Sequence, residues 1–461
     1  MADIVCISPI DGREVARRRA ASGAEAAAAI AAARKAQPEW ARLPVRERAA
    51  AMLRFLDAMR AMNGEVVPEL ARQMGRPVRY GGELGSLAER VEHMVAIAEQ
   101  ALAPVVPEAR AGFRRRIARE PLGLVLVIAP WNYPYLTAVN TVVPALVAGN
   151  AVLLKASSQT ILTGDRFQAA MDRAGLPAGL FRHLVLDHAG AERLIAGGDV
   201  DHVSFTGSVA GGRAIERAAA GTFASVALEL GGKDPAYVRD DADLDLAVEC
   251  TVDGTYYNSG QSCCGIERIY VAQSLYSRFV DGFVALARSY VLADPLDPAT
   301  SLGPMAATRF ADLVRAHTAE AVARGASALI DEAAFPISRP GTPWLAPQVL
   351  TGVDHSMRVM REESFGPVVG IMPIRDDEQA IALMNDSPYG LTASVWTRDL
   401  DAAERIGARL QTGTVYANRC DYLDPALAWT GVKDTGRGAS LSPLGYATLT
   451  RPKSYHLREA T

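Results

Sequence analysis

The run Leu124-Val-Leu-Val-Ile-Ala129, bounded by Gly123 and Pro130, decides the fold class of this chain of 461 residues. Short segments that are apolar at nearly every position are typical of strands buried on both faces of a parallel sheet. The same pattern returns at residues 151–154, 183–186, 202–205 and 224–228. Helical stretches are expected between them, at residues 136–148, 161–174 and 211–220. This alternation predicts a doubly wound α/β domain.

A second alternating series of strands and helices predicts a second α/β domain that begins near Gly231. The first hundred residues are expected to be helical, with segments at 24–37, 45–60 and 84–103. Residues 103–120 resemble neither domain and carry the basic run Arg114-Arg115-Arg116. A solvated strand edge is the favoured interpretation of this run, and an anion site is the alternative.

The charge balance gives no reason to expect a nucleic-acid or membrane partner. Lys and Arg number 48 and Asp and Glu number 52, a formal net charge of -4, whereas such partners attract basic chains. No apolar run approaches the roughly 18 residues of a membrane span, and no secretory signal peptide is expected. Five cysteines in so long a chain do not form a disulfide framework. A reducing, cytoplasmic setting is therefore expected.

The sharpest local feature is the stretch Asn258-Ser-Gly-Gln-Ser-Cys263-Cys264. A Cys in a loop rich in Gly and Ser is a plausible nucleophile if its thiol is ionised. The alternative is an inert buried Cys that packs as a small apolar side chain.

A carboxylate stands at the end of a predicted strand, in Glu229-Leu-Gly-Gly-Lys233. Catalytic residues of open α/β sheets gather at the carboxyl ends of strands, and paired glycines leave room for a close approach. A carboxylate beside an apolar strand end is a candidate general base with a raised pKa. The alternative is an ordinary salt bridge from Glu229 to Lys233.

The third motif, Pro130-Trp-Asn132-Tyr-Pro134, directly follows the first predicted strand. The Asn132 amide is a candidate N–H donor to an oxyanion. The alternative is a turn bounded by prolines, in which Asn132 caps the local backbone.

Two further strand ends are candidates for cofactor contacts. Lys155 lies in Leu153-Leu-Lys-Ala-Ser-Ser-Gln-Thr160, and Phe205-Thr-Gly-Ser208 opens a predicted helix. The free backbone N–H groups and the dipole of a helix N-terminus favour the anionic pyrophosphate of a dinucleotide.

In order and spacing, these five motifs resemble the aldehyde dehydrogenase superfamily, and the resemblance runs from about Ser8 to Lys453. Asn418 and the stretches 362–368 and 385–394 are further matches. The resemblance implies an α/β fold with a Rossmann-type cofactor domain, an α/β catalytic domain and a small β oligomerisation flap. The implied boundaries are 1–102 with 122–230 for the cofactor domain, 231–430 for the catalytic domain, and 103–121 with 431–461 for oligomerisation.

The resemblance implies oxidation of an aldehyde to the carboxylic acid, with hydride transfer to NAD or NADP. Cys263 matches the nucleophile that forms the thioacyl-enzyme, Glu229 the general base and Asn132 the oxyanion donor. The positions implied for cofactor binding are Lys155, Ser158, Gly207, Ser208, Glu363, Phe365 and Trp131. Those implied for the substrate pocket are Tyr133, Leu136, Asn140, Ser262, Arg419, Leu423 and Trp429. No metal is expected, because the seven His residues show no metal-ligand spacing.

Departures from the family pattern bear on the cofactor and on the aldehyde. Ser158 stands where NAD-preferring relatives carry a Glu, so acceptance of NADP is expected. Trp429 is expected to reshape the aldehyde entrance, and Arg419 is either an anchor for an anionic tail or an ordinary surface residue. The alternatives for the function are a CoA-acylating semialdehyde dehydrogenase on the same fold and a non-catalytic binding protein. A homodimer or homotetramer is expected.

Overall fold

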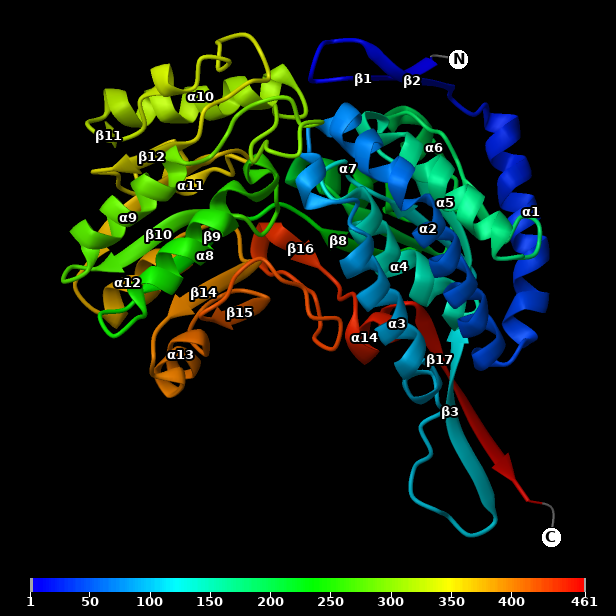
Figure 1. The fold of residues 1–461 in the computed structure, drawn as a ribbon. Coiled ribbons are helices and arrows are strands. Elements are labelled where there is room, and N and C mark those ends of the chain that lie inside the picture. The colour runs from blue at the N-terminus through cyan, green and yellow to red at the C-terminus, as the bar shows by residue number, and fades with distance from the viewer. Residues whose placement is uncertain (1–2, 460–461) are drawn as a thin grey trace.

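Two mainly parallel sheets and a projecting two-stranded ribbon form most of the fold in this computed structural model, which describes residues 3–459 (Figure 1). The first sheet has the strand order β16-β8-β7-β4-β5-β6. Its strands are β4 (Leu124–Ile128), β5 (Ala151–Lys155), β6 (Phe181–His183), β7 (His202–Thr206), β8 (Ser225–Glu229) and β16 (Gly436–Arg437). Every pair is parallel except β16 with β8. The predicted α/β class is confirmed.

Helices cover this sheet on both faces, as the apolar strands require. They are α1 (Gly23–Arg42), α2 (Val45–Met74), α3 (Leu84–Ala101), α4 (Pro134–Ala148), α5 (Leu162–Arg173), α6 (His188–Ala196) and α7 (Val209–Ala219). All residues of β4 and β5 are buried, which explains why these strands are apolar throughout. The chain also begins with an unexpected hairpin of β1 (Asp3–Ile7) and β2 (Glu14–Arg19).

The second sheet has seven strands in the order β11-β12-β13-β10-β9-β14-β15. Its strands are β9 (Asp234–Val238), β10 (Ile266–Ala272), β11 (Ser327–Ala328), β12 (Gln348–Thr351), β13 (Val368–Ile374), β14 (Thr392–Trp396) and β15 (Thr414–Ala417). Its helices are α8 (Leu244–Tyr256), α9 (Tyr276–Arg288), α10 (Thr308–Ala323), α11 (Arg358–Arg361), α12 (Asp377–Asn385) and α13 (Leu400–Gly407). The first strand of this second sheet along the chain is β9.

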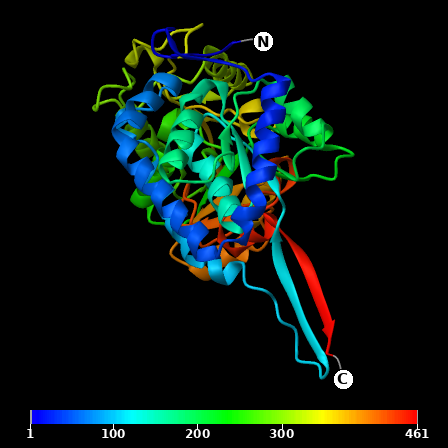
Figure 2. The same ribbon diagram turned by 90° about the vertical axis from the view of Figure 1, so that its right-hand side faces the viewer.

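A two-stranded ribbon of β3 (Phe113–Pro121) and β17 (Thr450–Arg458) extends away from both sheets (Figures 1 and 2). The basic run lies on β3, where the Arg116 guanidinium stands 4.1 Å from the ring centroid of Tyr455. The segment 431–461, expected to serve oligomerisation, contains three elements. β16 joins the first sheet, and α14 (Ser442–Thr448) packs on α3 and α4. Only the last element of the segment, β17, belongs to the ribbon.

No helix within residues 3–459 combines the length and the apolar character that crossing a membrane requires.

Candidate active site

The three predicted catalytic motifs meet between the two sheets. Glu229 ends β8, Asn132 follows β4, and Cys263 lies in the loop before β10. Glu229 and Cys263 line one cavity of about 230 Å³. Six of the seven predicted substrate residues line the same cavity: Tyr133, Leu136, Asn140, Ser262, Leu423 and Trp429.

The loop that carries Cys263 has a left-handed backbone at two consecutive residues, with φ of 54° at Asn258 and 56° at Ser259. Such conformations cost free energy in residues other than Gly and persist where the surroundings hold them. The Asn258 amide donates to the backbone oxygens of Gln261 and Asn132, both at 3.3 Å. The Gln261 side chain accepts from the Ala306 N–H at 2.8 Å. Hydrogen bonds from two directions therefore fix the loop that carries Cys263.

The two adjacent cysteines have different surroundings. Cys263 is partly exposed, whereas Cys264 is buried and donates from Sγ to Oδ1 of Asp421 at 2.8 Å. Its hydrogen bond with Cys263, then burial and the charge of Asp421, raise the pKa of Cys264 well above its usual value. Both cysteines line the cavity, and Cys263 is the more exposed of the two.

Glu229 accepts one hydrogen bond at each carboxylate oxygen. Ser440 Oγ donates to Oε1 at 2.6 Å, and Thr206 Oγ1 donates to Oε2 at 3.2 Å. Burial raises the pKa of Glu229, while these two donors and the charge of Arg90 act in the opposite direction. The salt bridge considered between Glu229 and Lys233 is not formed, because Lys233 pairs with Glu267.

The paired glycines after Glu229 are sites of close approach. A Cβ at Gly232 would stand 2.3 Å from the backbone oxygen of Cys263, and one at Gly231 would stand 2.4 Å from Oε1 of Glu363. Distances below 3.0 Å essentially never occur for real Cβ atoms. The two glycines thus let the Cys263 loop and the Glu363 loop approach the end of β8.

Asn132 is buried, and its Nδ2 donates to the backbone oxygen of Gln261 at 3.2 Å. The alternative of a local cap is not observed, since α4 begins after Tyr133 without a side-chain cap. A buried ion pair, with Arg76 Nη1 and Glu83 Oε1 2.6 Å apart, holds this loop. Arg76 also donates to the Asn132 backbone oxygen.

Glu83 also accepts hydrogen bonds from two backbone N–H groups at the start of α4, those of Tyr135 at 3.0 Å and Leu136 at 2.8 Å. A carboxylate at a helix N-terminus is stabilised by the helix dipole. The sequence motifs gave no sign of Arg76 or Glu83, because their partners lie about fifty residues away in the chain.

Three residues predicted for cofactor binding, Trp131, Glu363 and Phe365, lie near one another. The rings of Trp131 and Phe365 are 5.5 Å apart, and Phe310, which the sequence did not single out, stacks on Trp131 at 5.1 Å. Glu363 accepts from the Gly232 N–H at 2.9 Å. Burial, followed by repulsion from Glu267, raises the pKa of Glu363 to about 8.

Glu267 fixes the position of this loop. Its carboxylate accepts the N–H groups of Ser364 at 2.8 Å and Phe365 at 2.9 Å, and it pairs with the fully buried Lys233. Buried charges in proteins require such pairing. Through this pair, the segment 363–365 is joined to the turn that follows Glu229.

The residues predicted for the adenosine and pyrophosphate end lie at or just after the carboxyl ends of β5 and β7, the strands on either side of β4. Lys155 is buried, and its Nζ lies 3.5 Å from the Ala156 oxygen, a long contact for a charged donor. Burial lowers the pKa of Lys155, and Asp187 opposes this effect. Ser158 is exposed. An ammonium group with so weak a contact fits a ligand rich in hydroxyl groups or phosphate oxygens.

Ser208 is the N-cap of α7, and its side chain accepts from the Gly211 N–H at 3.2 Å. A Cβ at Gly207 would stand 2.7 Å from Cζ of Phe205, so the turn can lie directly on that ring only with Gly at this position. The first N–H groups of α7 have no carbonyl partner inside the helix, which suits an anionic group.

Arg419, the seventh predicted substrate residue, is not part of this cavity. It lines a neighbouring depression, and its guanidinium stands 3.5 Å from the ring centroid of Tyr422. The cavity instead holds three charged residues that the motifs did not indicate, Arg90, Asp253 and Asp421. From the sequence alone, an Arg within a predicted helix is expected on the solvent-exposed face of that helix.

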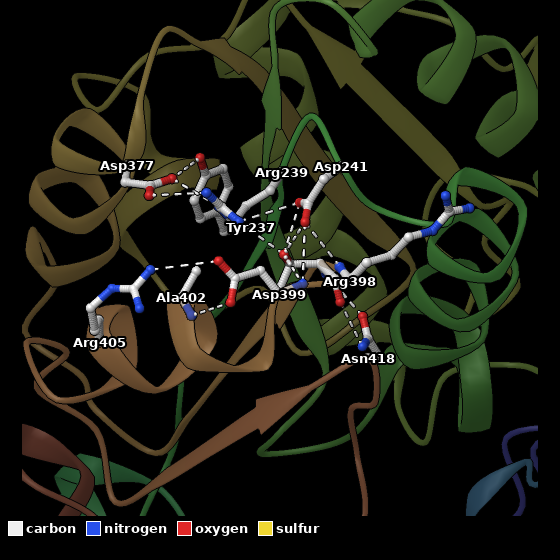
Figure 3. A network of polar contacts seen from close by, with 10 residues as sticks. Tyr237, Arg239, Asp241, Asp377, Arg398, Asp399, Ala402, Arg405 and Asn418 are labelled. Carbon is white, nitrogen blue, oxygen red and sulfur yellow. Dashed lines mark hydrogen bonds and ion pairs between the residues drawn. The ribbon is translucent and has the colours of Figure 1, made fainter.

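Asn418 begins the loop that closes the cavity, and a polar network fixes this residue (Figure 3). Its side chain accepts from the Thr397 N–H at 3.0 Å and donates to the Thr397 oxygen at 2.8 Å. Asp241 holds the same turn through the N–H groups of Arg398 and Asp399, both at 3.2 Å. The start of the loop is thus tied to the ends of β9 and β14.

Comparisons with known proteins agree with this geometry. A profile of the aldehyde dehydrogenase family matches residues 2–455. The chain is 35% identical over 453 residues to the succinate-semialdehyde dehydrogenase (NADP+) of Deinococcus radiodurans, covering 97% of this chain and 93% of that protein. It is 33% identical over 456 residues to betaine aldehyde dehydrogenase 2 of Rhizobium meliloti, covering 98% and 93%. PnpE, solved in complex with nicotinamide adenine dinucleotide, superposes with a TM-score of 0.94 at 29% identity, covering 100% of this chain and 95% of that chain.

The fold and these relatives define an oxidoreductase that acts on aldehydes, with NAD or NADP as its cofactor. The chain belongs to the aldehyde dehydrogenase family.

Proposed function

We propose that this enzyme oxidises its aldehyde to the carboxylic acid through a thioester on Cys263. The observation that carries the proposal is the shared cavity, in which Glu229 and the open thiol of Cys263 face the same space. A covalent intermediate divides one difficult oxidation into two easier steps.

In the first half of the reaction, the Cys263 thiolate attacks the aldehyde carbon and forms a C–S bond. The Asn132 amide carries two N–H groups, and the one not bound to Gln261 donates to the resulting oxyanion, together with the Cys263 backbone N–H. The C–S adduct then loses hydride and becomes a thioester. The bound cofactor supplies the nicotinamide that accepts this hydride.

In the second half, Glu229 takes a proton from water, and the hydroxide attacks the thioester carbon. The C–S bond breaks, the carboxylic acid leaves, and Cys263 returns as a thiolate. The raised pKa of Glu229 suits this work, because a base is most effective when its pKa approaches the working pH. A carboxylate in this position supports water as the acyl acceptor rather than CoA.

We further propose that residues 1–102 and 122–230 bind the cofactor and that 231–430 supply the nucleophile.

The ribbon of β3 and β17 is proposed to join copies of the chain into a homodimer or homotetramer. Its neighbourhood exposes apolar side chains, including Val106 at 70% and Leu457 at 45%. Contiguous exposed apolar surface often marks a protein interface.

Trapping the acyl-enzyme tests the mechanism. Glu229→Gln keeps the shape of the side chain but cannot take the proton from water. With an aldehyde and NAD(P), intact-mass spectrometry should show one acyl group on Cys263, while steady-state turnover falls about 100-fold or more. Glu216→Gln, outside the cavity, is the control and should show neither effect. Normal turnover in Glu229→Gln would exclude Glu229 as the base, and rapid acyl-CoA formation by wild type would identify CoA as the acceptor.

A further inference from the structure

The reaction cavity contains a buried guanidinium that neither attacks the aldehyde nor transfers a proton in the proposed chemistry. Arg90 projects from α3 and lines the same cavity as Cys263 and Glu229. The residue is only 6% exposed. Moving a charge from water into so buried a place is costly unless the charge is paired and hydrogen-bonded.

The hydrogen bonds of Arg90 leave part of this demand unmet. Nη1 donates to the Leu136 oxygen and to Oδ1 of Asn140, both at 3.0 Å. Within the described part of the chain, the buried Nε has no hydrogen-bond partner. A guanidinium has five N–H donors in a planar fork that matches a carboxylate. At least one N–H donor of Arg90 therefore lacks an acceptor.

Two carboxylates that line the cavity and interact electrostatically with Arg90 are held by other donors. Glu229 accepts from Ser440 and Thr206. Asp421 accepts from Cys264 at 2.8 Å and from Ser262 at 3.4 Å. Neither carboxylate needs Arg90 to satisfy its oxygens, so Arg90 has capacity for an anion that enters the cavity.

We propose that Arg90, with Asn140 beside it, binds a carboxylate carried by the aldehyde, so that the substrate class is an ω-oxo acid. This inference rests on the proposed function, because it concerns the aldehyde that Cys263 attacks. Charge-assisted bonds between guanidinium and carboxylate are strong and directional, so the anchored end orients the aldehyde end toward the thiol. The cavity of about 230 Å³ is small beside the roughly 300–1,000 Å³ of drug-sized sites, which favours short oxo acids.

The test compares aldehydes that differ only at the far end. 4-Oxobutanoate is paired with butanal, and 5-oxopentanoate with pentanal, so that a methyl group replaces the carboxylate. Betaine aldehyde supplies the opposite charge. For the wild type, kcat/KM of one oxo acid should exceed that of its uncharged partner about 10- to 100-fold, as expected for a charged hydrogen bond.

Arg90→Met should remove this ratio, chiefly through the KM of the oxo acid, and Arg90→Lys should keep part of it. Arg48→Met is the matched control. Arg48 is also 6% exposed and donates to backbone oxygens, including Val147 at 2.7 Å near the end of α4. Its loss should lower stability while the ratio between oxo acid and alkanal stays at the wild-type value.

A wild-type enzyme that prefers alkanals or betaine aldehyde overturns the proposal. An equal loss of kcat/KM with every aldehyde in Arg90→Met also overturns the proposal. Arg90 would then have a structural role, in which it holds α3 and α4 together. If Arg90→Met does not fold, the ratio in wild type and Arg90→Lys decides. A failure of the thioester mechanism would appear in the acyl-enzyme trapping and not in this ratio, so the two ideas fail separately.

Discussion

Ser440 Oγ donates a hydrogen bond of 2.6 Å to Oε1 of Glu229, across 211 positions of sequence. The segment after the second sheet thus returns to the first sheet and supports the proposed base. This bond lowers the pKa of Glu229, against the larger effect of burial, which raises it. The hydroxyl therefore keeps more of the carboxylate in the ionised form that can accept a proton.

Ser440→Ala should move the acid limb of deacylation to higher pH. The bond favours the charged carboxylate, so its loss raises the pKa of Glu229 and leaves less base at a given pH. A hydrogen bond to a charged group contributes about 1.5 kcal/mol, which corresponds to a displacement of about one pH unit. The measurement is the single-turnover rate of acid release between pH 5 and about 9.

Thr206→Val provides the comparison, because its hydroxyl reaches the same carboxylate at the longer distance of 3.2 Å. A smaller displacement in the same direction is expected. An acid limb that stays in place in both variants would assign the pH dependence to a group other than Glu229.

The adjacent cysteines should respond differently to substitution. Cys263→Ala should abolish NAD(P)H production, because it removes the more exposed of the two thiols that line the cavity. Cys264→Ala should keep most of the turnover and lose about 1 kcal/mol of stability with its bond to Asp421. Peptide mapping after iodoacetamide treatment should find Cys263 labelled first. Loss of turnover in Cys264→Ala alone would reassign the nucleophile.

Glu267→Gln should destabilise the protein and weaken the cofactor site together. The change leaves the fully buried Lys233 without its counter-charge, a loss of about 3–5 kcal/mol for broken buried pairs. It also weakens the bonds to Ser364 and Phe365, so the KM for the cofactor should rise more than the KM for the aldehyde. Thermal unfolding measures the loss of stability, and steady-state kinetics measure the two KM values.

The double variant Lys233→Met/Glu267→Gln is the control for this pair. Without the buried ammonium, the midpoint of thermal unfolding should recover in part, while the cofactor KM should stay raised. A double variant less stable than Glu267→Gln would show that the buried charge is not the source of the loss.

The sequence predicted the parallel strands best where burial is complete. Residues 124–128, 151–155 and 202–206 form β4, β5 and β7, close to their apolar runs. The run at 183–186 was displaced, since β6 is Phe181–His183. Leu184 and Leu186 are nevertheless buried. An apolar run indicates which residues are buried, but it does not show which of them pair with the neighbouring strand. Here the pairing with β5 begins at Phe181, which lies opposite Val152.

The site was predictable where its chemistry lies in short motifs, and not where it depends on distant pairs. Cys263, Glu229 and Asn132 each lie within a few residues of the end of a strand, inside a recognisable stretch. Glu267 looks like an ordinary strand residue until Lys233, 34 positions away, is placed beside it. Arg90 likewise meets Asn140 only when α3 packs on α4, 50 positions apart in the chain.

Cofactor choice should depend on Ser158, which is exposed beyond the end of β5. A Glu at this position would repel the 2′-phosphate of NADP by about 1 kcal/mol or more near a protein surface. Ser158 removes that repulsion and offers a hydroxyl, and Lys155 supplies a positive charge nearby. Wild type should therefore accept NADP.

Asp187 acts against this preference, because its negative charge influences Lys155 and would also repel a phosphate. The expected result is acceptance of both cofactors, with kcat/KM for NADP falling about 10-fold relative to NAD in Ser158→Glu. Asp187→Asn should move the ratio the other way, toward NADP. Steady-state kinetics with each cofactor measure the ratio in all three proteins. If wild type rejects NADP as strongly as Ser158→Glu does, Ser158 does not face the ribose and other contacts select the cofactor.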